Sequence, residues 1–215
     1  MMKRYAIFDL DGTLLDSMKI WDKIGDEFLK SYGITPPRDL AEILKTMSLK
    51  QSAEYLKRAF SLPVGADEII DIINKMAEEK YRAGVLLKPY AFEYLQKLKS
   101  LNVRMCIVTA TDYTIAAEVL TRLGVADCFE FIITCASAGC GKDDPQIYLL
   151  AAERFGCKPH EAVIFEDALH CIKTAKNAGF YVVGVDDISA RQDKREIKKI
   201  SDCYINSFVE MEDFN

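Results

Sequence analysis

The chain opens with a short apolar run, Tyr5-Ala6-Ile7-Phe8-Asp9-Leu10-Asp11-Gly12-Thr13-Leu14, that ends in two aspartates and a glycine. Aliphatic and aromatic residues bounded by a glycine are typical of a buried strand. Asp9 and Asp11 would then lie at the carboxyl end of that strand, which is the edge of a sheet where α/β proteins bind ligands. Two like charges are costly to bury unless a cation or a reaction uses them. The segment therefore indicates a site of chemistry.

The residues after Pro89 alternate between helical and strand patterns. The predicted strands, which are rich in apolar residues, are 103–108, 131–134, 162–165 and 181–185. The predicted helices, with apolar residues at helical spacing, are 90–100, 113–123, one after Pro145 and one that ends at Ala178. Alternating elements of this kind favour a parallel sheet. We therefore predict a doubly wound, Rossmann-like α/β core made of residues 1–15 and 88–215, with a last strand and a short helix from Tyr204 onward.

Residues from Met18 to about Gly84 follow a helical pattern instead. Apolar residues such as Ile24 and Phe28 recur at the spacing of one helix face. We predict that residues 16–87 form an all-helical domain inserted directly after the first strand. Trp21 is expected to belong to the hydrophobic core of this insertion.

Charge and composition exclude several kinds of partner. The 215 residues carry a formal net charge of -5, which argues against a nucleic-acid groove or an anionic membrane surface as a partner. The sequence has no apolar run of membrane-spanning length and no apolar signal region at its start. Its seven cysteines, an odd number, are scattered through the predicted elements and predict free thiols in a reducing compartment. We expect a cytoplasmic protein that is by default a monomer.

Polar residues follow the other predicted strands as well. Thr109 follows the second, Gly141-Lys142 follows the third after a short loop, and Glu166-Asp167 follows the fourth. With Asp9 and Asp11 they bring four carboxylates, a hydroxyl and an ammonium to one edge of the sheet, beside helix N-termini that attract anions. Mg²⁺ prefers carboxylate oxygens, and phosphoryl transfer needs a nucleophile, a proton donor, a metal and a cationic clamp. The pattern therefore predicts phosphoryl-transfer chemistry.

The chain resembles the haloacid dehalogenase-like hydrolases in four motifs that follow the family's order: Asp9-Leu10-Asp11-Gly12-Thr13, Thr109, Gly141-Lys142 and Glu166-Asp167. The helical insertion after the first motif resembles the helical cap of that family. Within the family, the chain looks most like the subgroup that contains beta-phosphoglucomutase and phosphoglycolate phosphatase. Each motif alone is a modest signal, but four in order at strand ends are highly specific.

The resemblance implies a role for each of these residues. Asp9 is the expected nucleophile, which becomes an aspartyl phosphate, and Asp11 is the expected general acid and then base. Thr109 and Lys142 are expected to hold the phosphoryl oxygens. The expected Mg²⁺ ligands are Asp9, Asp11 through its backbone carbonyl, Glu166 and Asp167. The residues expected to contact the substrate are Gly12, Thr13, Asp16, Thr109, Ala110, Lys142 and Lys45.

The implied function is a Mg²⁺-dependent phosphatase that acts on a small phosphorylated metabolite such as a sugar phosphate, with the cap closing over the substrate. A phosphosugar mutase is an alternative. Mutases of this subgroup use a cap histidine near the position of Trp21, whereas both histidines of this chain, His160 and His170, lie in the core half. A non-catalytic metabolite-binding protein is a second alternative, and Lys19 leaves a phosphonatase as a third.

Two positions depart from the pattern of the family. Asp143 follows the motif lysine, where a proline is common, and Tyr90 follows Pro89, where a glycine is usual. Neither change removes a catalytic group. His170, one helical turn beyond Asp167, is expected to have a surface or capping role rather than a role in the site.

Overall fold

Six parallel strands form one sheet in the described part of the chain. The computed structural model describes residues 4–45 and 47–211. The strands lie in the order β3-β2-β1-β4-β5-β6. Their bounds are β1 Tyr5–Phe8, β2 Arg104–Thr109, β3 Phe131–Thr134, β4 Ala162–Glu166, β5 Tyr181–Val185 and β6 Cys203–Ile205. The sheet is the doubly wound α/β core that the alternating sequence pattern predicts.

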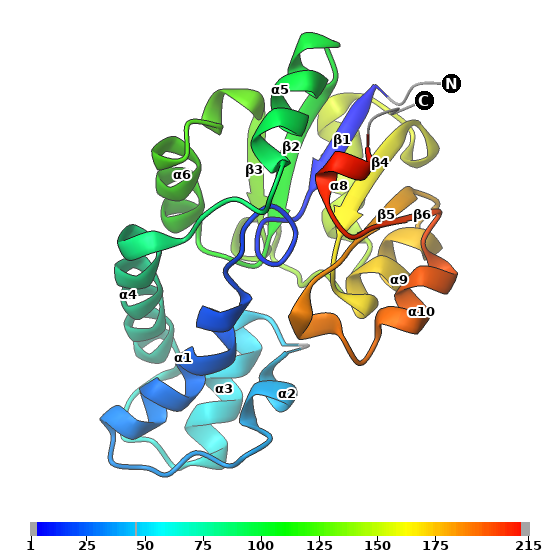
Figure 1. The fold of residues 1–215 in the computed structure, drawn as a ribbon. Helices are drawn as coiled ribbons and strands as arrows, with labels where there is room; N and C mark the ends of the chain where they lie inside the picture. Colours follow the sequence, from blue (N-terminus) through cyan, green and yellow to red (C-terminus); the bar gives the residue numbers. More distant parts are fainter. Residues whose placement is uncertain (1–3, 46, 212–215) are drawn as a thin grey trace. The chain divides into compact units, whose positions relative to one another are not determined.

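Helices cover both faces of this sheet (Figure 1). Their bounds are α5 Ala91–Ser100, α6 Tyr113–Arg122, α7 Cys135–Ala138, α8 Gln146–Phe155, α9 Leu169–Asn177 and α10 Lys194–Ile200. On one face, Ile7 of β1 belongs to a buried cluster with Ile147 of α8 and Ile172 of α9. The next residue, Phe8, points to the other face and stacks on Phe165 of β4 with the ring centroids 4.4 Å apart. Successive strand residues thus supply two separate apolar layers, as a sheet buried on both sides requires.

The first strand lies at the point where the chain order reverses. β1 pairs with β2 on one side and with β4 on the other, and such a reversal opens a crevice at the carboxyl ends of the strands. After β1 the chain turns sharply at Gly12, whose φ of +81° favours glycine. The backbone N–H of Leu15 closes the turn by donating to the carbonyl of Leu10 at 2.8 Å. This turn keeps Asp9 and Asp11 at the carboxyl end of β1.

The chain divides into two compact units. The first contains the chain up to Asp16 and from Leu86 onward, and the second is Ser17–Val85. The helices of the second unit are α1 Met18–Ser31, α2 Leu40–Leu44, α3 Leu49–Ala59 and α4 Ala66–Gly84. The indole N–H of Trp21 on α1 donates to the hydroxyl of Tyr81 on α4 at 2.8 Å, and their rings meet edge to face. Trp21 therefore packs within this unit, as predicted, but it is half-buried rather than part of the buried core.

Two of the differences between the observed and the predicted elements have a clear local cause. The segment after β3, predicted to be a short loop, begins with the four-residue helix α7. The cause is a capping box in which the Thr134 hydroxyl accepts from the Ser137 N–H and the Ser137 hydroxyl accepts from the Thr134 N–H, both at 3.0 Å. The helix predicted to begin at Tyr90 begins at Ala91, because Tyr90 has a φ of +64°. The tail contains β6 and a short 3-10 helix, Phe208–Glu210, as expected, and residues 212–215 lie outside the described residues.

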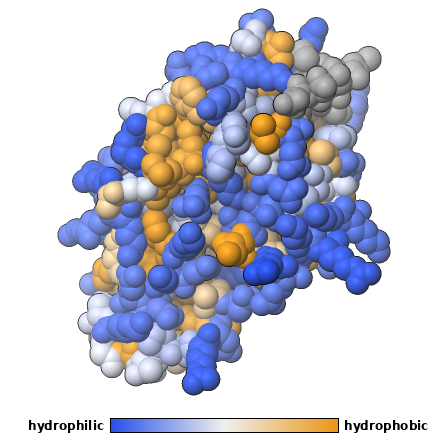
Figure 2. All heavy atoms as spheres, in the orientation of Figure 1, coloured by the Kyte–Doolittle hydropathy of each residue, from blue (hydrophilic) through white to orange (hydrophobic). Residues whose placement is uncertain are grey.

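Hydrophilic side chains cover most of the molecular face in Figure 2, and hydrophobic side chains reach it in smaller groups. Among the described residues, no helix has both the length and the apolar character needed to cross a membrane. All seven cysteines lie within the described residues and are free thiols, as the sequence predicts.

Candidate active site

Three carboxylates meet where β1 and β4 end. Asp9 follows β1, and its backbone N–H donates to the carbonyl of Phe165 at 3.0 Å. Glu166 is the last residue of β4 and Asp167 follows it. One ligand oxygen from each of the three carboxylates lies within 4.8 Å of the other two, and all three side chains are buried. The parallel pairing of β1 with β4 brings together residues that are more than 150 positions apart.

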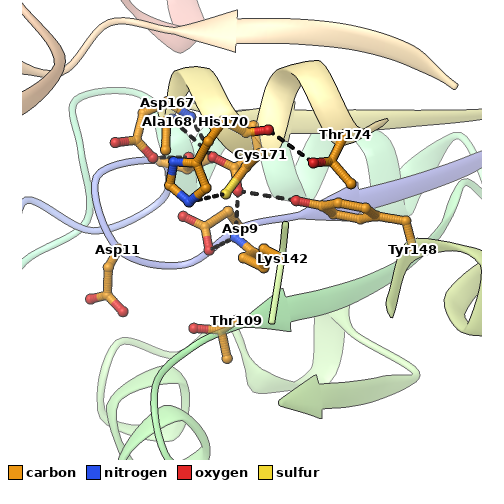
Figure 3. Close-up of polar contacts among 12 residues, drawn as sticks. Asp9, Asp11, Thr109, Lys142, Tyr148, Asp167, Ala168, His170, Cys171 and Thr174 are labelled. Atoms are coloured by element: carbon orange, nitrogen blue, oxygen red, sulfur yellow. Dashed lines mark hydrogen bonds and ion pairs between the residues drawn. The ribbon is translucent and has the colours of Figure 1, made fainter. Parts of the chain in front are cut away.

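Lys142 places an ammonium against this cluster. Its Nζ donates to Oδ1 of Asp9 at 2.5 Å and also to Oε1 of Glu166, and only 8% of the residue is exposed. Tyr148 of α8 donates its hydroxyl to the same Glu166 oxygen at 3.5 Å. Figure 3 shows Lys142 meeting Asp9 beside the start of α9. One buried cation is thus shared between two carboxylates.

The shared cation leaves part of the negative charge uncompensated. Burial raises the pKa of Asp9 to about 7, although the charge of Lys142 opposes this. Burial opposes ionisation of Glu166 too, but there the charge and hydrogen bond of Lys142 prevail and lower the pKa. Burial and the charge of Glu166 raise the pKa of Asp167 well above its ordinary value. A divalent cation would relieve this surplus, so the donor set, three carboxylate oxygens, fits a hard ion such as Mg²⁺.

Backbone and hydroxyl donors fix the orientation of two of these carboxylates. Thr13, fully buried, donates its hydroxyl to Oδ1 of Asp167 at 3.0 Å. Oε2 of Glu166 accepts from the N–H groups of Asp167 and Ala168 at 2.9 and 3.0 Å. The two oxygens of Glu166 therefore have different partners: Oε1 accepts from Lys142, and Oε2 accepts from backbone N–H groups just before α9.

Asp11 is held by a residue that sequence reasoning missed. The hydroxyl of Thr111 donates to Oδ2 of Asp11 at 2.6 Å, and the N–H of Thr111 donates to the hydroxyl of Thr109 at 3.0 Å. Figure 3 shows the carboxylate of Asp11 apart from the pair of Asp9 and Lys142. The only sequence signal for Thr111 was a second hydroxyl residue two positions after Thr109, which is also a common helix-start pattern.

The surroundings of His170 differ from the expected surface or capping role. The residue is half-buried, and its Nε2 lies 3.2 Å from the buried thiol of Cys171. Its charge is among the influences that lower the pKa of Glu166, behind the larger effects of burial and Lys142. Both residues lie in the first turn of α9, and Figure 3 shows them above Asp9 in this view. The helical spacing from Asp167 indicated that His170 could approach the carboxylates, but the sequence alone could not distinguish this position from a surface position.

The other residues predicted to contact a substrate are more dispersed. Gly12 is buried in the turn after β1, and Ala110 is exposed directly after Thr109. Asp16 is exposed where the chain leaves the first unit for the second. Lys45 lies in the second unit at the end of α2. The structure thus brings together Asp9, Thr13, Lys142, Glu166 and Asp167, and separately Asp11, Thr109 and Thr111.

Comparison with known proteins gives a consistent result. The model of a family described as haloacid dehalogenase-like hydrolase matches residues 6–185. The chain is 31% identical over 177 residues to the phosphorylated carbohydrates phosphatase of Thermotoga maritima, with 81% of each protein covered. It is 30% identical over 190 residues to the fructose-1-phosphate phosphatase YqaB of Escherichia coli, covering 86% of this chain and 98% of that protein. The crystal structure of CbbY from Rhodobacter sphaeroides in complex with phosphate has the same fold, with a TM-score of 0.87 at 22% identity, covering 99% of this chain and 97% of that one.

Proposed function

The chain belongs to the haloacid dehalogenase-like hydrolases, and we propose that it is a Mg²⁺-dependent phosphatase that hydrolyses a small phosphomonoester through an aspartyl phosphate. The observation that carries this proposal is the buried cluster of Asp9, Glu166 and Asp167 with Lys142 against it. A protein that only bound a metabolite would gain nothing from burying three carboxylates around one ammonium, since such burial is costly.

In this mechanism Asp9 and Asp11 share the covalent and proton-transfer steps. An oxygen of Asp9 bonds to phosphorus as the bond from phosphorus to the leaving alkoxide breaks, and Asp11 gives that alkoxide its proton. Water then attacks the phosphorus and gives a proton to Asp11, while the bond to Asp9 breaks and inorganic phosphate leaves. Asp11 must leave the hydroxyl of Thr111 or act while still bonded to it.

Fixed positive charge and hydroxyl donors stabilise the transferring phosphoryl group. Lys142 already lies against Asp9, so it is placed to neutralise phosphoryl oxygens next to the nucleophile. Thr109, buried at the end of β2, is proposed to donate a further hydrogen bond. Asp9, Glu166, Asp167 and the carbonyl of Asp11 would hold Mg²⁺, which supplies electrostatic stabilisation of charge on the phosphoryl oxygens when bound.

The names of two relatives support a proposal for the class of substrate. Two of them, each at least 30% identical to this chain, are named as phosphatases of phosphorylated carbohydrates and of fructose 1-phosphate. We infer that this chain acts on sugar phosphates or similar small metabolites, in the cytoplasm and as a monomer. No nucleic-acid partner is proposed, in keeping with the net charge of -5.

Hydrolysis is favoured over phosphosugar isomerisation by the residues of the second unit. That unit has no histidine in its sequence, since His160 and His170 both belong to the first unit. Trp21, near the position where mutases of the subgroup carry a histidine, is bonded to Tyr81. The sequence of that unit therefore offers no histidine for the additional acid–base step that a mutase uses.

The proposal is tested by inorganic phosphate release from a panel of small phosphomonoesters, with Mg²⁺ and with EDTA. We expect Mg²⁺-dependent release by the wild type and none by Asp9→Asn. Conversion of a hexose 1-phosphate to its 6-phosphate without net release would establish the mutase instead. Retained metabolite binding with no turnover of any compound would favour the non-catalytic alternative.

A further inference from the structure

Lys88 connects three segments of the first unit. It lies two residues after the chain re-enters that unit at Leu86. Its backbone N–H donates to the carbonyl of Leu14, in the loop after β1, at 2.8 Å. Its ammonium donates to the carbonyl of Asp186 at 2.6 Å and pairs with Oδ2 of Asp187 at 2.9 Å. A single residue thus joins the outgoing loop, the returning segment and the end of β5.

The ion pair of Lys88 and Asp187 is largely shielded from solvent, and its polar atoms have hydrogen-bond partners. The side chains keep 12% and 4% of their exposure. The second carboxylate oxygen of Asp187 accepts from the N–H and the hydroxyl of Ser189 at 2.9 and 2.7 Å. Burying two charges is costly unless their geometry is fixed and their remaining polar atoms are bonded. The geometry of this pair is fixed and its polar atoms are bonded, yet neither residue takes part in the proposed reaction.

The pair is connected to the carboxylate cluster through one short stretch of chain. Leu14, which accepts from the backbone of Lys88, follows Thr13, and Thr13 donates to Asp167. Movement of the returning segment would therefore move the hydroxyl that orients Asp167. The pair is also near enough for its charges to act on Asp167: after burial and the nearer carboxylates, Asp187 raises the pKa of that group and Lys88 lowers it.

We propose that Lys88, anchored by Asp187, is a positioning residue that fixes the loop carrying Thr13 and thereby orients the metal-binding carboxylate of Asp167. This inference rests on the proposed function, in which Asp167 is a ligand of Mg²⁺. Removing a hydrogen-bond partner behind a metal ligand typically weakens metal binding about 10- to 100-fold. Lys88 acts through the intervening loop, so a loss of about tenfold, the lower end of that range, is expected.

The test is the dissociation constant of Mg²⁺, measured by calorimetry without substrate, for Lys88→Met, Asp187→Asn and the double variant. Positioning predicts that each single variant binds about tenfold more weakly and that the double variant is no weaker than either. A simple charge effect predicts opposite signs, because removing the cation of Lys88 would favour Mg²⁺ and removing the anion of Asp187 would disfavour it. Tighter binding by Lys88→Met would therefore overturn the inference.

Controls separate positioning from general damage. Lys88→Arg keeps the cation and is expected to bind Mg²⁺ within about threefold of the wild type. Lys99→Met removes an exposed ion pair with Asp127 (2.6 Å). Lys99 lies just before β2 begins, at the amino ends of the strands and away from the carboxylates, so this variant should leave the Mg²⁺ affinity unchanged. Circular dichroism reports folding. The double variant has no unpaired buried charge, so it carries the test if a single variant does not fold.

The outcomes also separate this inference from the proposed function. If the wild type does not bind Mg²⁺, both are overturned. If the wild type binds Mg²⁺ and releases phosphate, while the folded Lys88→Met and double variants bind it equally well, the positioning role alone is wrong.

Discussion

The carboxylate of Asp9 shares the ammonium of Lys142 with the carboxylate of Glu166. Lys142 stabilises the ionised form of Glu166, whereas burial raises the pKa of Asp9 from 3.8 to about 7. Between these two values the native protein binds more protons at Asp9 than the unfolded chain does. In the metal-free protein this residue therefore stabilises folding least at high pH, and its contribution is lost as the pH rises through about 7.

The same raised pKa values predict that Mg²⁺ binding releases protons. Metal ligands must be deprotonated, and both Asp9 and Asp167 have pKa values above the ordinary range. The affinity for Mg²⁺ should therefore fall as the pH drops below about 7. Calorimetry in two buffers of different ionisation enthalpy, at about pH 6 and about pH 8, measures both the affinity and the protons released. An affinity and a binding enthalpy independent of pH and buffer would contradict the electrostatic picture of the site.

Replacing Asp11 tests the proton-transfer role separately. Asp11→Asn should keep the fold and lower kcat by about a hundred- to ten-thousandfold, because general acid–base catalysis contributes that much. Asp143→Asn is a matched control, since it removes an exposed carboxylate next to Lys142, and should retain nearly the full rate. A near-normal kcat for Asp11→Asn in the phosphate-release assay would remove Asp11 from the mechanism.

The start of α5 contains a local strain that the fold tolerates. Tyr90 has the left-handed backbone conformation, with a φ of +64°, at the position where a glycine is usual in the family. That conformation costs a residue with a Cβ atom about 1–2 kcal/mol, and glycine adopts it freely at an entropic cost of about 0.5–1 kcal/mol. The side chain of Tyr90 is 53% exposed, so little packing is lost when it is removed.

Tyr90→Gly is therefore expected to stabilise the protein by about 0.5–1 kcal/mol in urea unfolding. Tyr113→Gly supplies the control, because Tyr113 is 58% exposed and begins α6 in a helical conformation. There the same chemical change should destabilise by up to about 1 kcal/mol. Destabilisation by both substitutions would show that the side chain of Tyr90 contributes more than its backbone costs.

Elements with strong local signals could be predicted closely. The apolar runs of β3 and β5 have the predicted bounds, and β2 is shifted by one residue. The helix α7 was missed because it depends on a capping box of only two short side chains, Thr134 and Ser137. A four-residue helix has too few positions to show a period.

At the scale of the complete chain, the part of the site formed by strand ends could be predicted, whereas the side-chain contacts that support it could not. The alternation of strands and helices implied a parallel sheet. In a parallel sheet, Asp9, Glu166 and Asp167 lie together at the carboxyl ends of the strands. Neither the bond from Thr111 to Asp11 nor the pair of Lys88 and Asp187 could be predicted, because each depends on how side chains outside the strands are directed, which the strand pattern does not fix. The role of residues 16–87 as a cap stays a prediction.

The most direct test of the central claim, that Asp9 carries the phosphoryl group during turnover, is rapid acid quenching followed by peptide mass spectrometry. The wild type would be mixed with Mg²⁺ and the best phosphomonoester of the panel, and quenched within a single turnover. We expect a phosphoryl group on the peptide that contains Asp9, which disappears as inorganic phosphate is released and which is absent in Asp9→Asn. Phosphate release without that adduct, or with the phosphoryl group on another residue, would contradict the proposed mechanism.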